Sequence, residues 1–302
     1  MCIRDSHKFI HLMGNILQNM GQNEEAERYF IKAEEMAIEQ SPQQYDVEQE
    51  KIIKKDLTYL LPIMKTRIGN KTINIDGINY SINCISERPL IFQLPNFISI
   101  EDCEHIMTRA NNQLEKSFVM GGNKDTNEPY RSSFNAWLSK DIILEKILQK
   151  LEIITNIPIS YLLQKTEELQ VVKYESQGQF KLHHDSSNFH PRFFTLLLYL
   201  NDLPENSGGE TYFPFSGSDR NFDDTIEDAI SKGFTLYDDE KGIFIKPKQG
   251  NAILFFNYNV NGEIDSSAVH AGLPLNSNTN EKWIANYWID FDFDLLVELI
   301  NK

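Results

Sequence analysis

Six short segments rich in β-branched and aromatic residues crowd the stretch between residues 169 and 291, and they constrain the fold more than any other feature. Gly, Pro, Asn and Asp separate them, as is typical of strands joined by turns. The segments are LQVVKY (169–174), RFFTLLLYL (192–200), ETYFPF (210–215), GIFIKP (242–247), NAILFFNY (251–258) and KWIANYWIDF (282–291). Because so many short strands form a closed or two-sheet architecture, the sequence predicts a jelly roll, or double-stranded β-helix.

Two amphipathic helices are expected before these strands. The first follows a short strand, LIFQL, and starts at Ser99, whose side chain can cap the helix together with Asp102 three residues later. The second is expected from about Ser139 to Ile154, with Pro158 closing the segment. Since helices come first and strands afterwards, the pattern favours an α+β fold with supporting helices over a βαβ arrangement.

The amino-terminal part carries small residues where two helices would touch. In the segment HLMGNILQNMGQNEEAERYFIKAEEMAIEQSP (11–42), Gly14, Ala26, Phe30 and Ala33 recur at a spacing that resembles a tetratricopeptide repeat. A single repeat cannot bury its own faces, so we expect an incomplete tetratricopeptide-like segment over residues 7–66. A generic amphipathic helical hairpin is the alternative.

A β-hairpin is expected between the two parts of the chain. KTINIDGINYSIN (71–83) alternates apolar and polar residues about Asp76-Gly77, a dipeptide typical of two-residue hairpin turns. The predicted organisation is therefore the helical segment at 7–66, a linker with a β-hairpin at 67–87, and a strand-rich domain at 88–302.

The charge and cysteine content narrow the classes of function. Of 302 residues, 29 are Lys or Arg and 44 are Asp or Glu, a formal net charge of −15, so nucleic acids would be repelled. The three cysteines form no CxxC pair, which argues against a zinc site or a disulfide scaffold. No apolar run reaches the roughly 18 residues of a membrane-spanning helix.

Two histidines and an aspartate stand together in YESQGQFKLHHDSS (174–187). Side chains alternate across an extended strand, so His183 and Asp185 can share a face while His184 points the other way. An imidazole and a carboxylate on one face supply two ligands of the two-His-one-carboxylate site that is typical of non-haem Fe(II) oxygenases. His270, between two predicted strands, is the candidate for the third ligand. An isolated HxD triplet is weak evidence, because surface or core histidines give the same letters.

Lys282 opens the apolar segment KWIANYWIDF. A lysine at the end of a strand can reach solvent, which is the simpler interpretation. The alternative is a counter-charge, because a buried ammonium is costly unless it is paired. A dicarboxylate that chelates a metal at one end would have its far carboxylate neutralised by Lys282.

Several ordered blocks resemble the catalytic domain of the prolyl 4-hydroxylases, which are iron(II)- and 2-oxoglutarate-dependent dioxygenases with a jelly-roll core. The blocks are EELQVVKYESQGQFKLHHD, TLLLYLNDLPENSGGETYFP, IKPKQGNAILFFNY, HAGLPL and KWIANYWI, and the upstream YRSSFNAWLS is similar to the collagen-type members. The resemblance covers about Arg88 to Asp292. It implies hydroxylation of peptidyl proline at the 4-position, coupled to oxidative decarboxylation of 2-oxoglutarate to succinate, with Fe(II), O₂ and ascorbate.

The resemblance also assigns roles to residues. His183, Asp185 and His270 match the iron ligands, and Lys282 matches the residue that pairs with the distal carboxylate of 2-oxoglutarate. The cosubstrate pocket is expected to include Tyr174 and Tyr199, which align with pocket tyrosines of relatives, and, by strand alternation, Thr195, Asn286 and Trp288. Arg131 and Trp137 match a block that approaches the peptide substrate in relatives.

Some features depart from the family pattern. The gap from His270 to Lys282 is longer than usual, which makes the register of the lysine the least secure assignment. Phe180 stands where many relatives have tyrosine. The acidic insert at 216–241 is either a solvated loop or a cover over the substrate.

The expected partners follow from the resemblance. They are a proline-containing peptide or protein substrate and a possible partner subunit or second copy of the chain, with no nucleic acid and no membrane span. The compartment is the endoplasmic reticulum lumen if a signal peptide precedes this sequence, and otherwise the cytoplasm. Rival interpretations are a related oxygenase acting on another residue or small molecule, a catalytically silent peptide-binding module, and a metal sensor of the cupin type.

Overall fold

The structure, a computed structural model, describes residues 57–58, 60–117, 132–187, 190–216, 242–276 and 281–301, together with Arg28. The chain divides into two compact units, residues 1–55 and 56–302. Only Arg28 of the first unit is described, so the predicted tetratricopeptide-like helices lie outside the described residues.

Within the described residues, the strands form a nine-stranded sheet and a four-stranded sheet, and every pairing is antiparallel. The large sheet has the order β1 (Gly69–Ile75), β2 (Ile78–Glu87), β3 (Leu90–Leu94), β11 (Ala252–Phe256), β8 (Arg192–Tyr199), β13 (Lys282–Asp290), β6 (Leu169–Tyr174), β5 (Phe134–Leu138), β4 (Glu115–Lys116). The small sheet has the order β10 (Ile243–Ile245), β9 (Thr211–Phe213), β12 (His270–Gly272), β7 (Phe180–His183). All six predicted strand segments are confirmed as strands.

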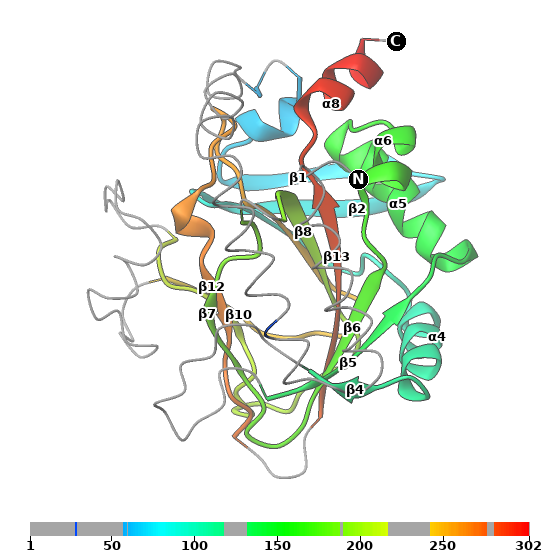
Figure 1. Cartoon of the computed structure of the whole chain (residues 1–302), viewed down its shortest axis with the longest axis vertical. Helices are drawn as coiled ribbons and strands as arrows, with labels where there is room; N and C mark the ends of the chain where they lie inside the picture. The colour runs from blue at the N-terminus through cyan, green and yellow to red at the C-terminus, as the bar shows by residue number, and fades with distance from the viewer. Residues whose placement is uncertain are drawn as a thin grey trace. The chain divides into compact units, whose positions relative to one another are not determined.

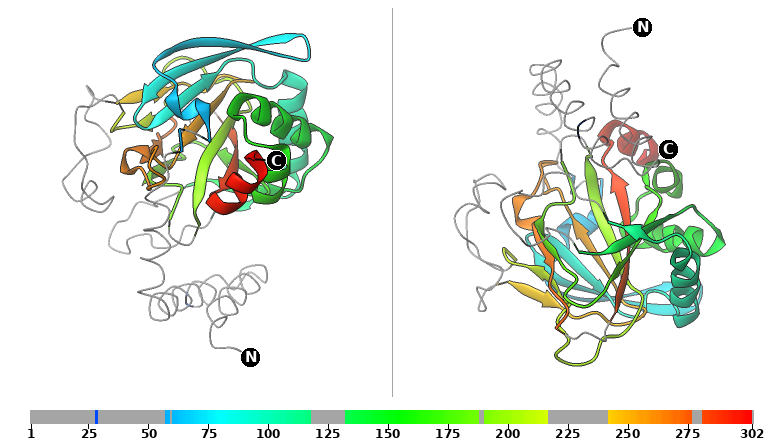
Figure 2. Two further views of the ribbon diagram at one scale, coloured as in Figure 1. Left: turned by 90° about the horizontal axis from the view of Figure 1, so that it is seen from above. Right: turned by 60° about the horizontal axis from the view of Figure 1, so that its bottom comes forward.

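The two sheets and three helices form successive layers. Figures 1 and 2 show α4 (Ile100–Asn111), α5 (Ile142–Thr155) and α6 (Ile159–Lys165) on the side of the large sheet that faces away from the small sheet. The carboxy-terminal α8 (Phe293–Ile300) lies beside α6. Tyr161 of α6 ties this layer to the end of β13, because its hydroxyl donates to the Asp290 carbonyl at 2.8 Å and accepts from the Asp292 N–H at 2.8 Å.

The interior between the two sheets is apolar and aromatic. Its core cluster takes residues from both sheets, among them Val172, Leu197, Tyr199, Phe213, Phe255 and Ile284. Strand β8 is buried along seven of its eight residues, because helices cover one face of the large sheet and the small sheet covers the other. Burial on both faces explains why RFFTLLLYL is a continuous apolar run rather than an alternating one.

Polar side chains cap the first turns of α4 and α5. Ser99 and Asp102 form the predicted capping box of α4. Helix α5 starts later than predicted, because Asp141 rather than Ser139 accepts the backbone N–H groups of the first turn, at 3.0 and 2.9 Å. Pro158, predicted to close that segment, instead sits at the N-cap of α6, a helix that the sequence patterns did not reveal.

The Asp76-Gly77 hairpin extends the edge of the large sheet. Asp76 and Gly77 have φ angles of 52° and 83°, as a two-residue turn of this kind requires, and β1 and β2 pair directly across it. Strand β2 also pairs with β3, so the segment predicted as a linker is part of the sheet. In the described part of the chain, no helix is long and apolar enough to span a bilayer.

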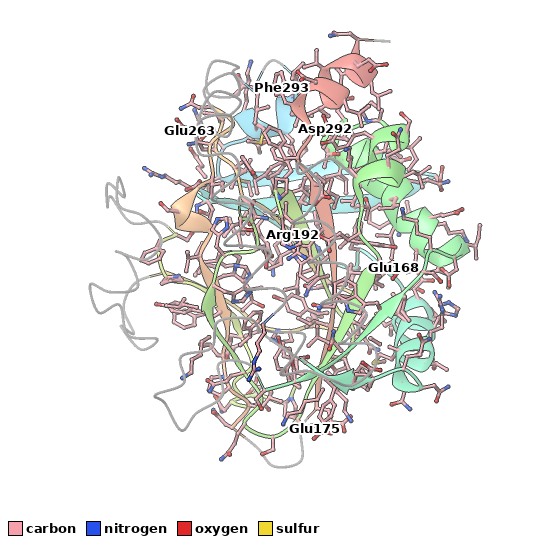
Figure 3. The ribbon with its side chains drawn as sticks, in the orientation of Figure 1. Glu168, Glu175, Arg192, Glu263, Asp292 and Phe293 are labelled. Atoms are coloured by element: carbon pink, nitrogen blue, oxygen red, sulfur yellow. The ribbon has the colours of Figure 1, made fainter. Side chains whose placement is uncertain are left out.

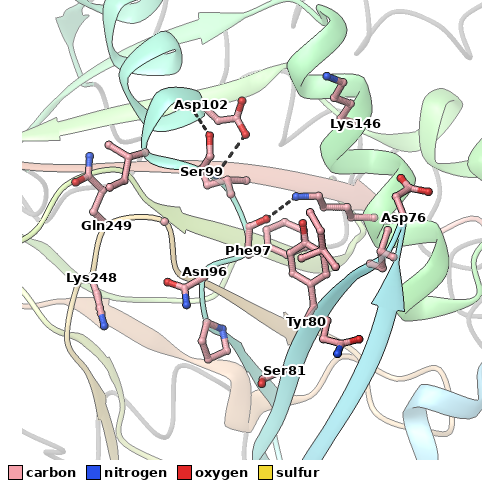
Figure 4. A pocket seen from close by; sticks show the side chains of 18 of the residues that line it. Asp76, Tyr80, Ser81, Asn96, Phe97, Ser99, Asp102, Lys146, Lys248 and Gln249 are labelled. Carbon is pink, nitrogen blue, oxygen red and sulfur yellow. Dashed lines mark hydrogen bonds between the residues drawn. The ribbon is translucent and has the colours of Figure 1, made fainter.

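A cavity of about 1000 Å³ lies between this hairpin, α5 and the connection from β3 to α4 (Figure 4). Lys150 reaches into its wall, where Nζ donates to the Phe97 carbonyl at 2.7 Å and lies 4.7 Å from the centre of the Tyr80 ring. None of the predicted site residues lines this cavity.

Candidate metal centre

The small sheet sets two histidines opposite each other. His183 is the last residue of β7 and His270 is the first residue of β12, and the two are direct partners in the antiparallel pair. Their ring centres are 4.3 Å apart. Residues directly opposite on neighbouring strands point to the same face, so both imidazoles enter the space between the sheets.

Asp185 completes a cluster of three metal-ligating side chains. One donor atom from each of His183, Asp185 and His270 lies within 4.8 Å of the others. His183 Nε2 is 3.7 Å from Asp185 Oδ1, and His270 Nε2 is 3.8 Å from Asp185 Oδ2. These side chains are 15%, 7% and 6% exposed, so the cluster is nearly buried. Two imidazoles and one carboxylate in this arrangement can hold an Fe(II) ion and leave coordination positions for other ligands.

Backbone carbonyls determine which nitrogen of each histidine faces the cluster. His183 Nδ1 is 2.8 Å from the Lys181 carbonyl, and His270 Nδ1 is 3.0 Å from the Ala268 carbonyl. A carbonyl only accepts, so each Nδ1 carries the proton and donates. Each Nε2 therefore faces Asp185, and it is the nitrogen that the neutral ring would offer to a metal.

The Asp185 carboxylate is held in its ionised form. Burial alone would raise its pKa, but the nearby imidazoles of His270 and His183, the Arg192 guanidinium and a hydrogen bond from Thr195 hold the pKa well below its usual range. The Thr195 hydroxyl donates to Asp185 Oδ2 at 2.7 Å. An ionised, oriented carboxylate is ready to bind a cation without losing a proton first.

His184 does not join the cluster. Its Nδ1 accepts from the Ser186 N–H at 3.0 Å, and its Nε2 donates to the Asp265 carbonyl at 3.1 Å. Burial lowers the pKa of this imidazole, so it stays neutral. Strand β7 ends at His183, and the chain bends after it, which is how Asp185 still converges on His183.

Lys282 lies in the same small cavity as the cluster. The lining comprises Tyr174, Phe180, His183, Asp185, Leu197, Thr211, His270, Ala271, Gly272, Lys282, Ile284, Asn286 and Trp288. The cavity volume is about 30 Å³. Lys282 is 2% exposed, so the buried counter-charge, and not the strand-end lysine in solvent, is what the structure places here.

The environment of Lys282 suits an anionic ligand. Burial lowers the pKa of its ammonium to about 8, and Glu210 acts weakly in the opposite direction. Among the described residues, no carboxylate forms an ion pair with Lys282, and its Nζ lies 5.2 Å from the centre of the Tyr174 ring. A ligand carboxylate in the cavity would supply the missing negative charge.

The other predicted pocket residues divide into two groups. Tyr174, Asn286 and Trp288 line the cavity, and the indole N–H of Trp288 has no hydrogen-bond acceptor among the described residues. Thr195 and Tyr199 do not line it. Thr195 lies behind Asp185, and Tyr199 lies behind Thr211, to whose Oγ1 its hydroxyl is bonded at 2.9 Å. Burial raises the pKa of Tyr199 well above its usual range, so it remains a neutral hydroxyl.

The predicted peptide-contacting residues are only partly visible. Arg131 lies outside the described residues, whereas Trp137 on β5 is 40% exposed and its ring centre is 5.8 Å from that of Trp288. Figure 3 labels Arg192 at the start of β8; its guanidinium lies 3.7 Å from the centre of the Trp288 ring and binds Glu167 through two nitrogens, at 2.6 and 3.0 Å.

Sequence patterns missed several residues of the site. They gave no signal for Arg192 or Glu167, because the two are paired only in three dimensions. Leu197, Thr211 and Ile284 also line the cavity. Leu197 and Ile284 could have been found by counting in steps of two from Tyr199 and Lys282 along their strands.

Comparison with known proteins places this site in a class. The sequence model of the 2OG-Fe(II) oxygenase superfamily matches residues 169–290 of this chain. This range contains His183, Asp185, His270 and Lys282. Fold, donor set and buried lysine together define an iron(II)- and 2-oxoglutarate-dependent dioxygenase, with O₂ as its oxidant.

Similar proteins narrow the class to a family. Prolyl 4-hydroxylase 13 of Arabidopsis thaliana is 30% identical over 76% of this chain and 82% of its own length. Prolyl 4-hydroxylase 2 of the same plant is 32% identical over 70% of this chain and 71% of its own length. The chain belongs to the prolyl 4-hydroxylase family. Among solved structures, the viral collagen prolyl hydroxylase of Paramecium Bursaria Chlorella virus-1, in complex with 2OG, is 24% identical, covering 66% of this chain and 94% of its own, with a TM-score of 0.45.

Proposed function

We propose that this chain hydroxylates peptidyl proline at the 4-position and couples that reaction to the oxidative decarboxylation of 2-oxoglutarate to succinate. The observation that carries the proposal is the convergence of His183, Asp185 and His270 in one cavity with Lys282. A scaffold without activity has no use for three metal-ligating groups beside a buried cation, because each of them costs stability when it is left unpaired.

Each residue of the cavity has a role that follows from its position. His183, Asp185 and His270 would hold Fe(II), and Fe(II) with 2-oxoglutarate and O₂ supplies the oxidising power when bound. Lys282, at the other end of the lining, would receive the distal carboxylate of the cosubstrate. Asn286 and Trp288, which line the same cavity, would fix its orientation. Ascorbate, typical of the family, would keep the iron reduced.

The peptide would approach from the side where Trp137 and Trp288 lie. Trp137 is the exposed member of this aromatic pair, so it is available to a substrate, and proline rings pack well on indole faces. Arg131 would contact the same peptide. The paired sheets would form a double-stranded β-helix, with the substrate-facing opening at the end where β7 and β12 carry the histidines.

Two experiments test the proposal. Proline-rich, collagen-like and short globular-protein peptides are incubated with the protein, Fe(II), 2-oxoglutarate and ascorbate, and mass spectrometry identifies the oxidised residue. A gain of one oxygen on proline supports the proposal, whereas oxidation of another residue type alone refutes it.

The second experiment measures succinate release from matched variants. His183→Ala should abolish it because an iron ligand is lost. His184→Ala should retain most of it, because His184 bonds only to backbone groups and not to the cluster. The reverse order of the two effects would show that the wrong histidine has been assigned.

A further inference from the structure

We propose that Asn257, immediately after β11, is a positioning residue of the metal centre, because it orients the Asp185 carboxylate through Thr195. The inference rests on the proposed function, in which Asp185 is an iron ligand. Asn257 touches none of the three ligand side chains itself, and nothing in its local sequence marks it. Its role follows from two linked hydrogen bonds, in which Asn257 donates to Thr195 and Thr195 donates to Asp185.

The direction of the hydrogen bonds is determined by the carboxylate. A carboxylate that binds a metal has no proton to donate, so Asp185 Oδ2 accepts, and the Thr195 hydroxyl donates its single proton to it at 2.7 Å. The Thr195 oxygen is then left as an acceptor, and Asn257 Nδ2 donates to it at 3.3 Å. The carbonyl end of the Asn257 amide cannot replace Nδ2 in this contact, because it has no proton to donate.

The hydrogen bonds from Asn257 to Thr195 and from Thr195 to Asp185 form a relay. This relay fixes the orientation of the Asp185 carboxylate. Oδ2 carries the hydrogen bond from Thr195, while Oδ1 lies toward His183 Nε2 at 3.7 Å. A hydrogen bond to a metal-ligating carboxylate restricts its rotation and tunes its basicity, and removing such a bond typically weakens metal affinity about 10–100-fold.

The backbone of Asn257 is bonded to β8, which carries Thr195, and to the turn that precedes His270. Its N–H donates to the Phe193 carbonyl on β8 at 2.9 Å, two residues before Thr195. Its carbonyl accepts from the Asp265 N–H at 2.8 Å, and Asp265 caps the short helix η3 (Ser266–Ala268) that ends just before His270. Asn257 therefore holds a fixed position relative to both Asp185 and His270.

The buried amide of Asn257 lowers the stability of the fold. The residue is fully buried, and its Oδ1 has no hydrogen-bond partner in the part of the chain that the structure describes. A buried acceptor without a partner destabilises a fold, and an apolar residue of similar size would avoid this. A polar group that does not benefit stability is expected where it serves a site.

Three variants test the relay. Asn257→Leu removes the donor and the unpaired acceptor at similar volume. Asn257→Asp keeps the shape but replaces the donor by an acceptor, which competes with Asp185 for the Thr195 proton. Thr195→Val breaks the relay at its middle, while Thr195→Ser retains the hydroxyl. The control is Asn251→Leu at the other end of β11, because Asn251 is also buried but bonds to the Asn96 N–H, outside the relay.

The metal-free full-length protein is titrated anaerobically with Co(II), and its visible ligand-field spectrum, dissociation constant and thermal unfolding are recorded. We expect Asn257→Leu, Asn257→Asp and Thr195→Val to bind Co(II) about 10–100-fold more weakly, with an altered spectrum. Asn257→Leu should unfold no earlier than the wild type. Thr195→Ser should restore wild-type binding, and Asn251→Leu should lower thermal stability without changing the Co(II) spectrum.

The outcomes separate this inference from the proposed function. Wild-type affinity and spectrum in both Asn257→Asp and Thr195→Val would overturn the relay, even if Asn257→Leu failed to fold. A loss of thermal stability in Asn257→Leu with unchanged Co(II) binding would also overturn it, because Asn257 would then act on the fold alone. If the wild type binds no Co(II), or if His183→Ala binds it equally well, the assignment of the metal centre itself fails.

Discussion

Lys282 and Tyr174 are direct partners in the antiparallel pair of β13 and β6, and the lysine Nζ lies 5.2 Å from the centre of the tyrosine ring. Both residues line the cavity that also contains the three metal-ligating side chains. An aromatic face stabilises a buried ammonium only in part, because the ring quadrupole replaces only some of the lost hydration. The carboxylate of a bound ligand would neutralise the remaining charge of Lys282.

Replacing this lysine should impair the cosubstrate selectively. In Lys282→Met, which keeps most of the side-chain length but removes the charge, we expect the KM for 2-oxoglutarate to rise by about 100-fold, since charged hydrogen bonds contribute roughly 1.5–3 kcal/mol. The control ligand is 2-oxopentanoate, which lacks the distal carboxylate, and its KM should not increase. An equal loss for both acids would show that Lys282 does not recognise that carboxylate.

The same lysine predicts a pH dependence. Burial lowers the pKa of Lys282 from its ordinary 10.5 to about 8, so the ammonium loses its proton as the pH rises through about 8. The KM for 2-oxoglutarate should therefore rise above pH 8, and in Lys282→Met this rise should be absent. A wild-type KM that is flat from pH 7 to 9.5 would contradict a binding role for the ammonium.

Rising pH should weaken cosubstrate binding but increase the stability of the fold. Burying the charged form destabilises the fold at pH values below about 8, and this penalty disappears as the pH rises from about 8 to 10.5. In that window the stability of the ligand-free wild type should increase relative to that of Lys282→Met, as measured by urea unfolding. A difference that does not change with pH would mean that the pKa of Lys282 is not shifted.

The exposed indole of Trp137 should affect the peptide and little else. Trp137→Ala is expected to raise the KM for a proline-containing peptide about 10-fold, because an aromatic contact and its buried area are lost. The KM for 2-oxoglutarate should stay the same. The matched control is Phe244→Ala, an aromatic residue of similar exposure on β10, at 44% against 40%. Equal effects of the two variants would argue against a specific peptide contact at Trp137.

Two glycines with similar backbone angles should differ in their tolerance of a side chain. Gly77 has a φ of +83° and open space around it, whereas Gly250 has a φ of +80° and a Cβ there would lie 2.7 Å from the Ile98 carbonyl oxygen. We expect Gly77→Ala to cost about 1 kcal/mol and Gly250→Ala roughly 3 kcal/mol, because only the second adds a backbone clash. Urea unfolding measures both, and equal losses would rule out the close approach at Gly250.

Local patterns in the sequence predicted the elements that local chemistry determines. Strand β6 coincides with the predicted LQVVKY segment, and the capping box at Ser99 starts α4 as expected. Strands β7 and β12, which carry His183 and His270, were not among the predicted segments, because FKLH and HAG lack the runs of β-branched and aromatic residues that marked the others. Helix α6 has only seven residues, too few for a helical period to show.

The site was predictable where the residue types themselves limit the chemistry. The HxD triplet, a distal histidine and a lysine in an apolar strand pointed to a metal and a dicarboxylate. The roles of Thr195 and Arg192 depend instead on which side chain lies opposite them after folding. Thr195 was expected in the cosubstrate pocket, since alternation along β8 puts it on the same face as Leu197 and Tyr199, but only the fold shows that Asp185 occupies that position.

The central claim is that His183, Asp185 and His270 bind Fe(II) in a cavity where Lys282 receives a 2-oxo dicarboxylate. The most direct measurement is the visible absorption of the anaerobic protein loaded with Fe(II), before and after addition of 2-oxoglutarate. We predict that a weak visible band of the chelated 2-oxo acid appears in the wild type and in His184→Ala, and is lost in His183→Ala. A featureless spectrum from wild-type protein that carries one Fe(II) per chain would contradict the account.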